Sequence, residues 1–291
     1  MQSGQAAAAA LASTWISRRA AANPLGKPVG IQLWTVNGPM QADAAGTLKK
    51  LRKIGYGVVE SAGFGKLTAK QFRQLLDDAG LACPSAHVSF NPDDLGAALD
   101  DANALGATYA TSGSLDAVVK AANPATAVVK KAMSLEEAKQ TAELANRFGA
   151  AAKRAGLQYV YHNHAREFAD QGGGAIGYDV LLRETNPELV KFEVDCGWMI
   201  FAGHDPIAYF KKYPNRFPLI HVKDFLPASD RSTGEMLGAE LGHGVVDYKP
   251  IFAAAAQAGL KHYFAEQEGP FARMDPLQAA QVDYDYLHSI D

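Results

Sequence analysis

Eight short runs rich in β-branched and aromatic residues alternate with amphipathic helical segments along this chain of 291 residues. A strand followed by a helix, repeated, predicts a parallel sheet, because each helix carries the chain back across the sheet. Eight such units close most simply into a barrel. We therefore expect a single (β/α)8 TIM barrel, with an open doubly wound sheet as the structural alternative.

The expected strands are short apolar runs bounded by Gly, Pro, Asn or Asp. They cover residues 29–34, 57–61, 82–88, 108–112, 157–162, 190–195, 217–222 and 261–266. The expected helices cover residues 44–54, 68–78, 92–105, 134–155, 178–184, 206–213 and 248–258. Ser134 begins the clearest helix, because Ser134 and Glu137 form a capping box. A long polar loop over residues 227–247 precedes the last helix.

Composition restricts the partners of the chain. It is 48% hydrophobic and 20% charged, with a net charge of -3 and no block of basic residues. This balance disfavours nucleic-acid binding, and no run approaches the roughly 18 apolar residues of a membrane span. We expect a small-molecule partner, and the sequence leaves open whether the chain forms a homo-oligomer.

The amino terminus differs from the rest of the chain. We divide the sequence into a tail over residues 1–27 and a barrel over residues 28–291. Residues 5–13 are alanine-rich like the core of a secretion signal, but the basic pair Arg18 and Arg19 follows that stretch instead of preceding it. If residues 5–13 are the core of a secretion signal without its basic N-terminal part, the protein is exported. If these residues are instead a frayed helical tail, the protein is cytoplasmic.

Four consecutive expected strands end in side chains that bind metals. These are His162, Asp195, His221 and Glu266, on strands five to eight. The carboxyl ends of barrel strands converge on one face, so these residues become neighbours there. A single His or Asp at a strand end is usually structural, but four in succession predict a divalent metal site with open positions.

Several segments together resemble a known family. They are Gly30-Ile31-Gln32-Leu33-Trp34, Leu51-Arg52-Lys53-Ile54-Gly55-Tyr56, Val58-Val59-Glu60, Tyr161-His162-Asn163-His164 with Glu167-Phe168, and His221-Val222-Lys223-Asp224. From about residue 28 onward the chain resembles the sugar phosphate isomerase/epimerase family, the xylose isomerase-like TIM barrels that also include apurinic endonuclease IV. The resemblance implies one divalent metal held by His162, Asp195, His221 and Glu266.

The chain departs from the family at strand five, where His162 replaces the usual carboxylate. An imidazole ligand favours Mn, Zn, Co or Fe over Mg. The replacement also removes a residue that many family epimerases use as an acid or base. A second departure is Trp198, which stands where the endonuclease branch has another metal-binding His, so endonuclease-like cleavage of phosphodiesters is disfavoured.

Other residues at the strand ends are candidates for catalysis or substrate binding. The candidate acids and bases are Glu266, His164, Glu167 and His87, and the candidate substrate-binding residues are Glu60, Lys223, Trp34 and Trp198. His87 could equally be a hydrogen-bonded core histidine, and either tryptophan could be ordinary packing instead of a surface for a sugar ring.

A metal with open positions can stabilise an enediolate, and the family resemblance implies a metal-dependent sugar isomerase or epimerase that acts on a carbohydrate or cyclitol through that intermediate. The same intermediate allows a second function, in which a lyase or hydrolase acts on 3-keto-glycosides by β-elimination. A carbohydrate-binding barrel without turnover is a third interpretation. A phosphorylated substrate is not supported, because only Gly269-Pro270 suggests the glycine-rich turn of a barrel phosphate site.

Overall fold

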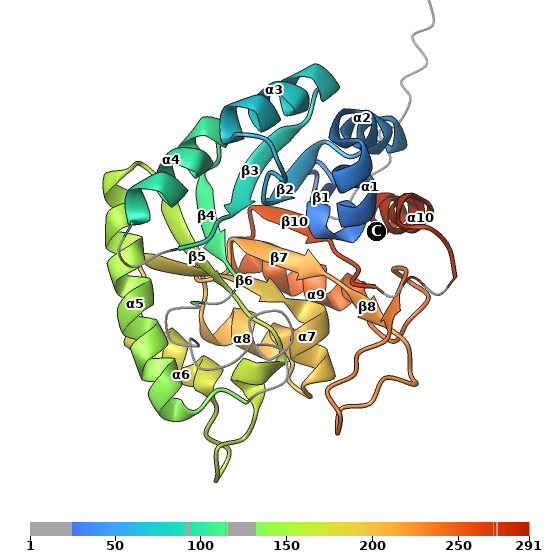
Figure 1. The fold of residues 1–291 in the computed structure, drawn as a ribbon. Coiled ribbons are helices and arrows are strands. Elements are labelled where there is room, and N and C mark those ends of the chain that lie inside the picture. The colour runs from blue at the N-terminus through green and yellow to red at the C-terminus, as the bar shows by residue number, and fades with distance from the viewer. Residues whose placement is uncertain are drawn as a thin grey trace, which may run out of the picture.

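A computed structural model describes residues 25–90, 94–113, 115, 132–269, 271 and 273–290 of the chain. Eight parallel strands close into a barrel in the order β1-β10-β7-β6-β5-β4-β3-β2, with helices around the outside (Figure 1). The prediction of a (β/α)8 barrel is confirmed. The open sheet is wrong, because Gly30 of the first strand pairs with Phe264 of the last. The alanine-rich stretch of the tail lies outside the described residues.

The barrel strands agree with the expected ones to within a few residues. They are β1 (Gly30–Gln32), β2 (Val58–Ala62), β3 (Ala82–His87), β4 (Tyr109–Ser112), β5 (Gln158–His162), β6 (Val190–Asp195), β7 (Leu219–Val222) and β10 (His262–Ala265).

Each expected helix is present, and side chains cap several of them as the sequence predicts. The helices that follow strands are α2 (Ala44–Ile54), α3 (Ala69–Ala79), α4 (Leu95–Leu105), α5 (Leu135–Arg154), α6 (Gly177–Glu184), α8 (Pro206–Lys212) and α9 (Tyr248–Gln257). Ser134 and Glu137 form the expected capping box at α5, and Thr68 with Gln71 forms another at α3.

Other elements are additions to the predicted set. They are the 3-10 helices η1 (Leu33–Val36) and η2 (Ala165–Phe168), the helices α1 (Asn37–Ala42), α7 (Cys196–Phe201) and α10 (Pro276–Ser289), and the strands β8 (Asp224–Phe225) and β9 (Gly238–Ala239). Helix α10 begins at Asp275, which caps it ahead of Pro276, and it packs against α2 and η1 beside the barrel (Figure 1). Strands β8 and β9 are too short to show a periodicity.

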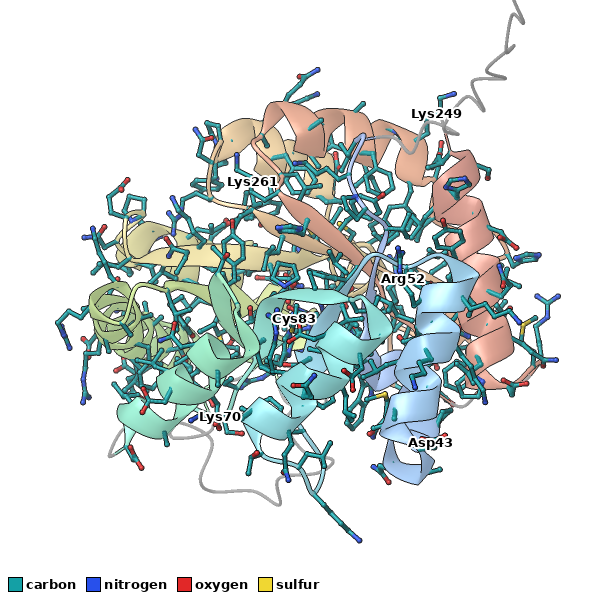
Figure 2. The ribbon with its side chains drawn as sticks, turned by 90° about the horizontal axis from the view of Figure 1, so that it is seen from above. Asp43, Arg52, Lys70, Cys83, Lys249 and Lys261 are labelled. Atoms are coloured by element: carbon teal, nitrogen blue, oxygen red, sulfur yellow. The ribbon has the colours of Figure 1, made fainter. Side chains whose placement is uncertain are left out.

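The barrel interior is built in layers. A lower layer is apolar and contains Val58, Val160, Leu219 and Phe264, with Tyr109 packed against them. The larger core lies between the barrel and the helices, and charged side chains such as Lys70 on α3 and Lys249 on α9 lie on the outside (Figure 2). The apolar layer closes the bottom of the barrel, so the interior is open to a ligand only at the carboxyl end of the strands.

Asp224 organises the long loop after β7. Its carboxylate accepts hydrogen bonds from the backbone N–H groups of Gly242, Gly244, Val245 and Val246 at 2.8 to 3.2 Å. One buried carboxylate thus fixes the segment that the sequence marks only as a polar loop. Among the described helices, none is long and apolar enough to cross a membrane.

A second buried carboxylate, Asp283 on α10, accepts a hydrogen bond from the backbone of Leu241 at 2.8 Å. Burial raises the pKa of Asp283 from 3.8 to about 7, and the nearby carboxylates of Glu240 and Asp224 raise it further while this hydrogen bond opposes the rise. Because the folded state holds this proton more tightly than the unfolded chain, the stability contribution of Asp283 falls as the pH rises from about 4 to about 7.

We predict that Asp283→Asn gains stability relative to the parent protein as the pH rises. Between pH 5 and pH 8 the difference in unfolding free energy should change by on the order of 3 kcal/mol in favour of the variant. Urea unfolding of both proteins at the two pH values measures this difference. Parallel stability curves would show that Asp283 is ionised in the folded protein at both pH values.

Candidate metal and substrate site

The polar layer above the apolar layer follows from the alternation of side chains along each strand. His162, His221 and Glu266 each stand two residues after a member of the apolar layer, so they point into the same interior. Asp195 at the end of β6 pairs in register with His221. All four predicted ligands are buried, with Glu266 the most exposed at 7%.

The structure brings these four residues together. One possible ligand atom from each of His162, Asp195, His221 and Glu266 lies within 4.8 Å of the others. His221 Nδ1 is 2.9 Å from Glu266 Oε2 and 3.9 Å from Asp195 Oδ2. The donor set of two imidazoles and two carboxylates is one that Zn, Mn, Fe or Co accepts.

Unsatisfied buried atoms support the fit of a cation. His162 Nδ1 and Asp195 Oδ2 lack a hydrogen-bond partner, although Lys223 Nζ lies 2.8 Å from Asp195 Oδ2 as an ion pair. Burial lowers the pKa of His162 well below its ordinary value, which keeps the ring neutral as a metal ligand requires. Asp195 Oδ1 caps α7 through the N–H of Trp198, and this bond fixes the carboxylate plane.

Glu193 is a residue of this layer that the sequence reasoning missed. It lies on the same face of β6 as Asp195 and is fully buried. Its Oε2 is 3.2 Å from His221 Nε2 and 3.5 Å from His162 Nδ1, and its Oε1 has no hydrogen-bond partner. The period of two along β6 was the signal that could have identified it.

Glu60 on β2 and His87 on β3 face Glu193 across the barrel interior, and His87 Nε2 lies 3.1 Å from Glu193 Oε2. Glu60 Oε2 is 2.6 Å from His221 Nε2 and 3.2 Å from His87 Nε2, and it accepts a hydrogen bond from Gln32 Nε2 at 2.8 Å. Burial opposes protonation of His87, but the Glu60 and Glu193 carboxylates raise its pKa to about 10. The His87 ring is therefore paired with carboxylates, and its side chain is 22% exposed to solvent.

Lys223 brings a positive charge to the opposite side of the layer. Its ammonium lies 2.8 Å from both Asp195 and Glu266, and it also pairs with Glu268, which the sequence reasoning did not single out. Burial opposes its charge, but these carboxylates raise the pKa of Lys223 well above its ordinary value. Trp198 is buried under the ammonium, 5.2 Å from it, and its Nε1 donates to Glu268 at 3.0 Å.

His164 and Glu167 have different surroundings. His164 is partly buried beside His162, its Nδ1 has no partner, and burial lowers its pKa to about 4. Glu167 lies outside the barrel interior, where it accepts hydrogen bonds from Tyr161 Oη at 2.8 Å and from the backbone N–H of His164 at 3.0 Å. Trp34 on η1 is 52% exposed at the rim.

Comparison with known proteins identifies the family of the chain. The model of the xylose isomerase-like TIM barrel family matches residues 48–288. The chain belongs to that family. It is 31% identical to the inosose dehydratase of Clostridium tetani over 160 residues, which are 50% of this chain and 52% of that protein. The chain thus spans about half the length of the curated relatives it matches.

Solved structures support the fold. A sugar phosphate isomerase/epimerase from Parabacteroides distasonis superposes with a TM-score of 0.73 over 91% of this chain and 94% of its own, at 24% identity. The IolI protein with a bound zinc atom superposes with a TM-score of 0.66 over 89% of this chain and 96% of its own, at 12% identity. At 24% and 12% sequence identity, these superpositions show a shared fold and nothing further.

Glu193 lies next to two of the expected ligands in the polar layer and provides a test of the metal site. A metal-binding imidazole usually donates its second N–H to a carboxylate, and loss of such a carboxylate typically lowers metal affinity about 10–100-fold. We predict that Glu193→Gln lowers the affinity for Mn or Zn by this factor, measured by competition with a chelator. Glu188→Gln, exposed and just ahead of the same strand, is the control. Equal affinities in the two variants would separate Glu193 from the metal site.

Proposed function

We propose that this family member is a metal-dependent lyase. It removes the proton next to the ketone of a cyclic keto-sugar or keto-cyclitol, and then expels the oxygen substituent on the following carbon. A divalent ion held by His162, Asp195, His221 and Glu266 would supply Lewis-acid polarisation of the substrate ketone and its neighbouring hydroxyl. The inosose dehydratase relatives support this class of reaction.

The observation that carries the proposal is the buried ammonium of Lys223 beside Glu266. Elimination needs a proton donor for the leaving oxygen as well as a base for the α-proton, whereas isomerisation and epimerisation return a proton to carbon. Lys223 is a cation next to the expected ligands and can donate that proton. The sequence alone placed isomerisation first. We place elimination first on the position of Lys223 and on the dehydratase relatives.

Other residues of the site fit the remaining steps. We assign proton abstraction to His164, because its Nδ1 is unpaired and its ring lies 4.9 Å from that of His162. We assign Glu167 to positioning, since its two carboxylate oxygens are engaged by Tyr161 and by the backbone of His164. His87 and Glu60 face the substrate from β3 and β2.

Isomerisation or epimerisation is the second candidate function. It is favoured by the carboxylate of Glu266, which can act as a base in addition to its ligand role and return a proton to the same carbon. The two reactions share the first proton transfer, but only the elimination then breaks a bond between carbon and oxygen. Their products therefore distinguish them.

The test uses the metal-loaded protein with inososes, 3-keto-glucosides, free sugars and sugar phosphates in deuterated buffer, with products identified by NMR. The lyase proposal predicts loss of water or of an alcohol and an unsaturated ketone. A moved carbonyl or one inverted stereocentre, without loss of a substituent, would support the second candidate and overturn the first. Absence of α-deuterium and of any product throughout this panel would overturn both.

Lys223→Gln separates the two proton transfers. We predict that the variant still exchanges the α-proton with solvent deuterium, because His164 is intact, but eliminates at least about 100-fold more slowly. Metal content is measured first, since Lys223 contacts two expected ligands. Lys261→Gln, exposed at the opposite end of the barrel, is the control. Equal slowing of exchange and elimination would assign Lys223 to substrate binding instead of leaving-group protonation.

A further inference from the structure

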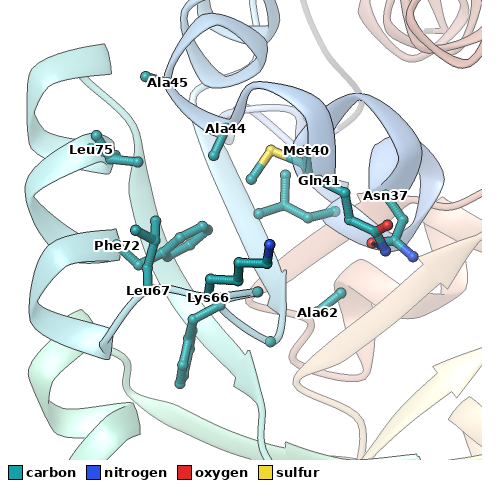
Figure 3. Close-up of a pocket in the computed structure, with 14 residues that line it drawn as sticks. Asn37, Met40, Gln41, Ala44, Ala45, Ala62, Lys66, Leu67, Phe72 and Leu75 are labelled. Atoms are coloured by element: carbon teal, nitrogen blue, oxygen red, sulfur yellow. Dashed lines mark hydrogen bonds between the residues drawn. The ribbon is translucent and has the colours of Figure 1, made fainter.

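A cavity of about 640 Å³ lies at the rim of the barrel between helices α1 and α2 on one side and α3 on the other (Figure 3). Met40 and Ala44 line it from the first side, and Leu67, Phe72 and Leu75 from the second. Small-molecule sites typically enclose roughly 300–1,000 Å³ and are mostly apolar. The size and lining suit an apolar group as large as an aromatic ring.

Ala62 connects this cavity with the polar layer of the barrel. It lines the cavity, it lies on the same face of β2 as Glu60, and it pairs in register with His87. Two residues along a strand span roughly 7 Å, so the cavity wall begins about one sugar ring away from Glu60. Leu33, another lining residue, directly follows Gln32, which hydrogen-bonds Glu60.

The polar groups of the cavity are donors or amides. The Lys66 side chain extends across it, and the amides of Asn37 and Gln41, joined by a 3.2 Å hydrogen bond, lie at its other end (Figure 3). Among the described residues that line the cavity, none is acidic. These groups match a ring that carries oxygen substituents, and they do not match a cationic one.

We propose that this cavity binds the leaving group of the substrate, and that this group is an aromatic alcohol joined to the keto-sugar through its oxygen. The inference rests on the proposed function and narrows its substrate class, because a departing hydroxyl would need no such space. The sugar ring lies over the polar layer while the aromatic ring packs between α1, α2 and α3.

The elimination is balanced without an oxidant or a second substrate. The base removes the α-proton, and the electron pair of that C–H bond forms a carbon–carbon double bond. The bond between the next carbon and the aromatic oxygen breaks, and this oxygen leaves as an aryloxide next to the Lys223 ammonium and takes its proton from water. The products are an unsaturated keto-sugar and the free aromatic alcohol.

The test compares the binding of phenyl β-D-glucoside and methyl β-D-glucoside to the metal-loaded protein by calorimetry or NMR titration. Neither compound has a ketone, so neither undergoes the elimination. Burying the phenyl ring should make its glucoside bind roughly tenfold or more tightly. Ala44→Phe, which fills the cavity, should remove this preference and leave binding of the methyl glucoside unchanged. Ala45→Phe serves the same purpose if Ala44→Phe does not fold, and Ala97→Phe, exposed on α4, is the control.

Equal affinities for the two glucosides, or no measurable binding of either, would overturn the inference. Equal loss of both ligands in the cavity-filling variant would also overturn it. A phenyl preference without cleavage of any keto-glycoside would retain the aromatic subsite and contradict the proposed elimination. Cleavage of keto-glycosides without an aromatic preference would contradict the subsite alone.

Discussion

An excess of buried negative charge governs the site. The carboxylates of Glu60, Glu193, Asp195 and Glu266 lie in one polar layer of the barrel interior, and Lys223 is the buried lysine among them. Buried charges are costly unless they are paired or bind a metal. The pKa of the His221 imidazole, opposed by burial, is raised well above its ordinary value by three of these carboxylates. The charge balance therefore favours a divalent cation beside the unsatisfied atoms of His162, Glu193 and Asp195.

The alternation of side chains made much of this arrangement predictable. His162, His221 and Glu266 follow inward-facing apolar residues by two positions, so a correct strand assignment was sufficient to place them in one layer. The barrel itself followed from eight alternating units whose helices carry clear caps. Helix α10 was missed, although Asp275 followed by Pro276 is a helix-start signal, because the strand pattern had already accounted for eight units.

The contacts between side chains across the barrel could not be predicted from the sequence. Glu193 lies in the expected strand over residues 190–195. Its contact with His221, however, depends on the register between β6 and β7. Glu268 lies beyond β10, the last strand, and its contact with Lys223 depends on the path that the chain takes after that strand. The same holds for the rim cavity, whose walls come from segments that the sequence does not relate to one another. Single-residue patterns identify the face of a strand, whereas the partner of a side chain depends on tertiary packing.

The account depends most on an ion held at the carboxyl ends of β5, β6, β7 and β10. Crystals of the protein grown with Mn or Zn, with diffraction recorded at the absorption edge of the metal, test this directly. We expect one anomalous peak at about 2.0–2.2 Å from His162, Asp195, His221 and Glu266. A peak coordinated elsewhere, or its absence in a protein that catalyses the reaction, would contradict the central claim.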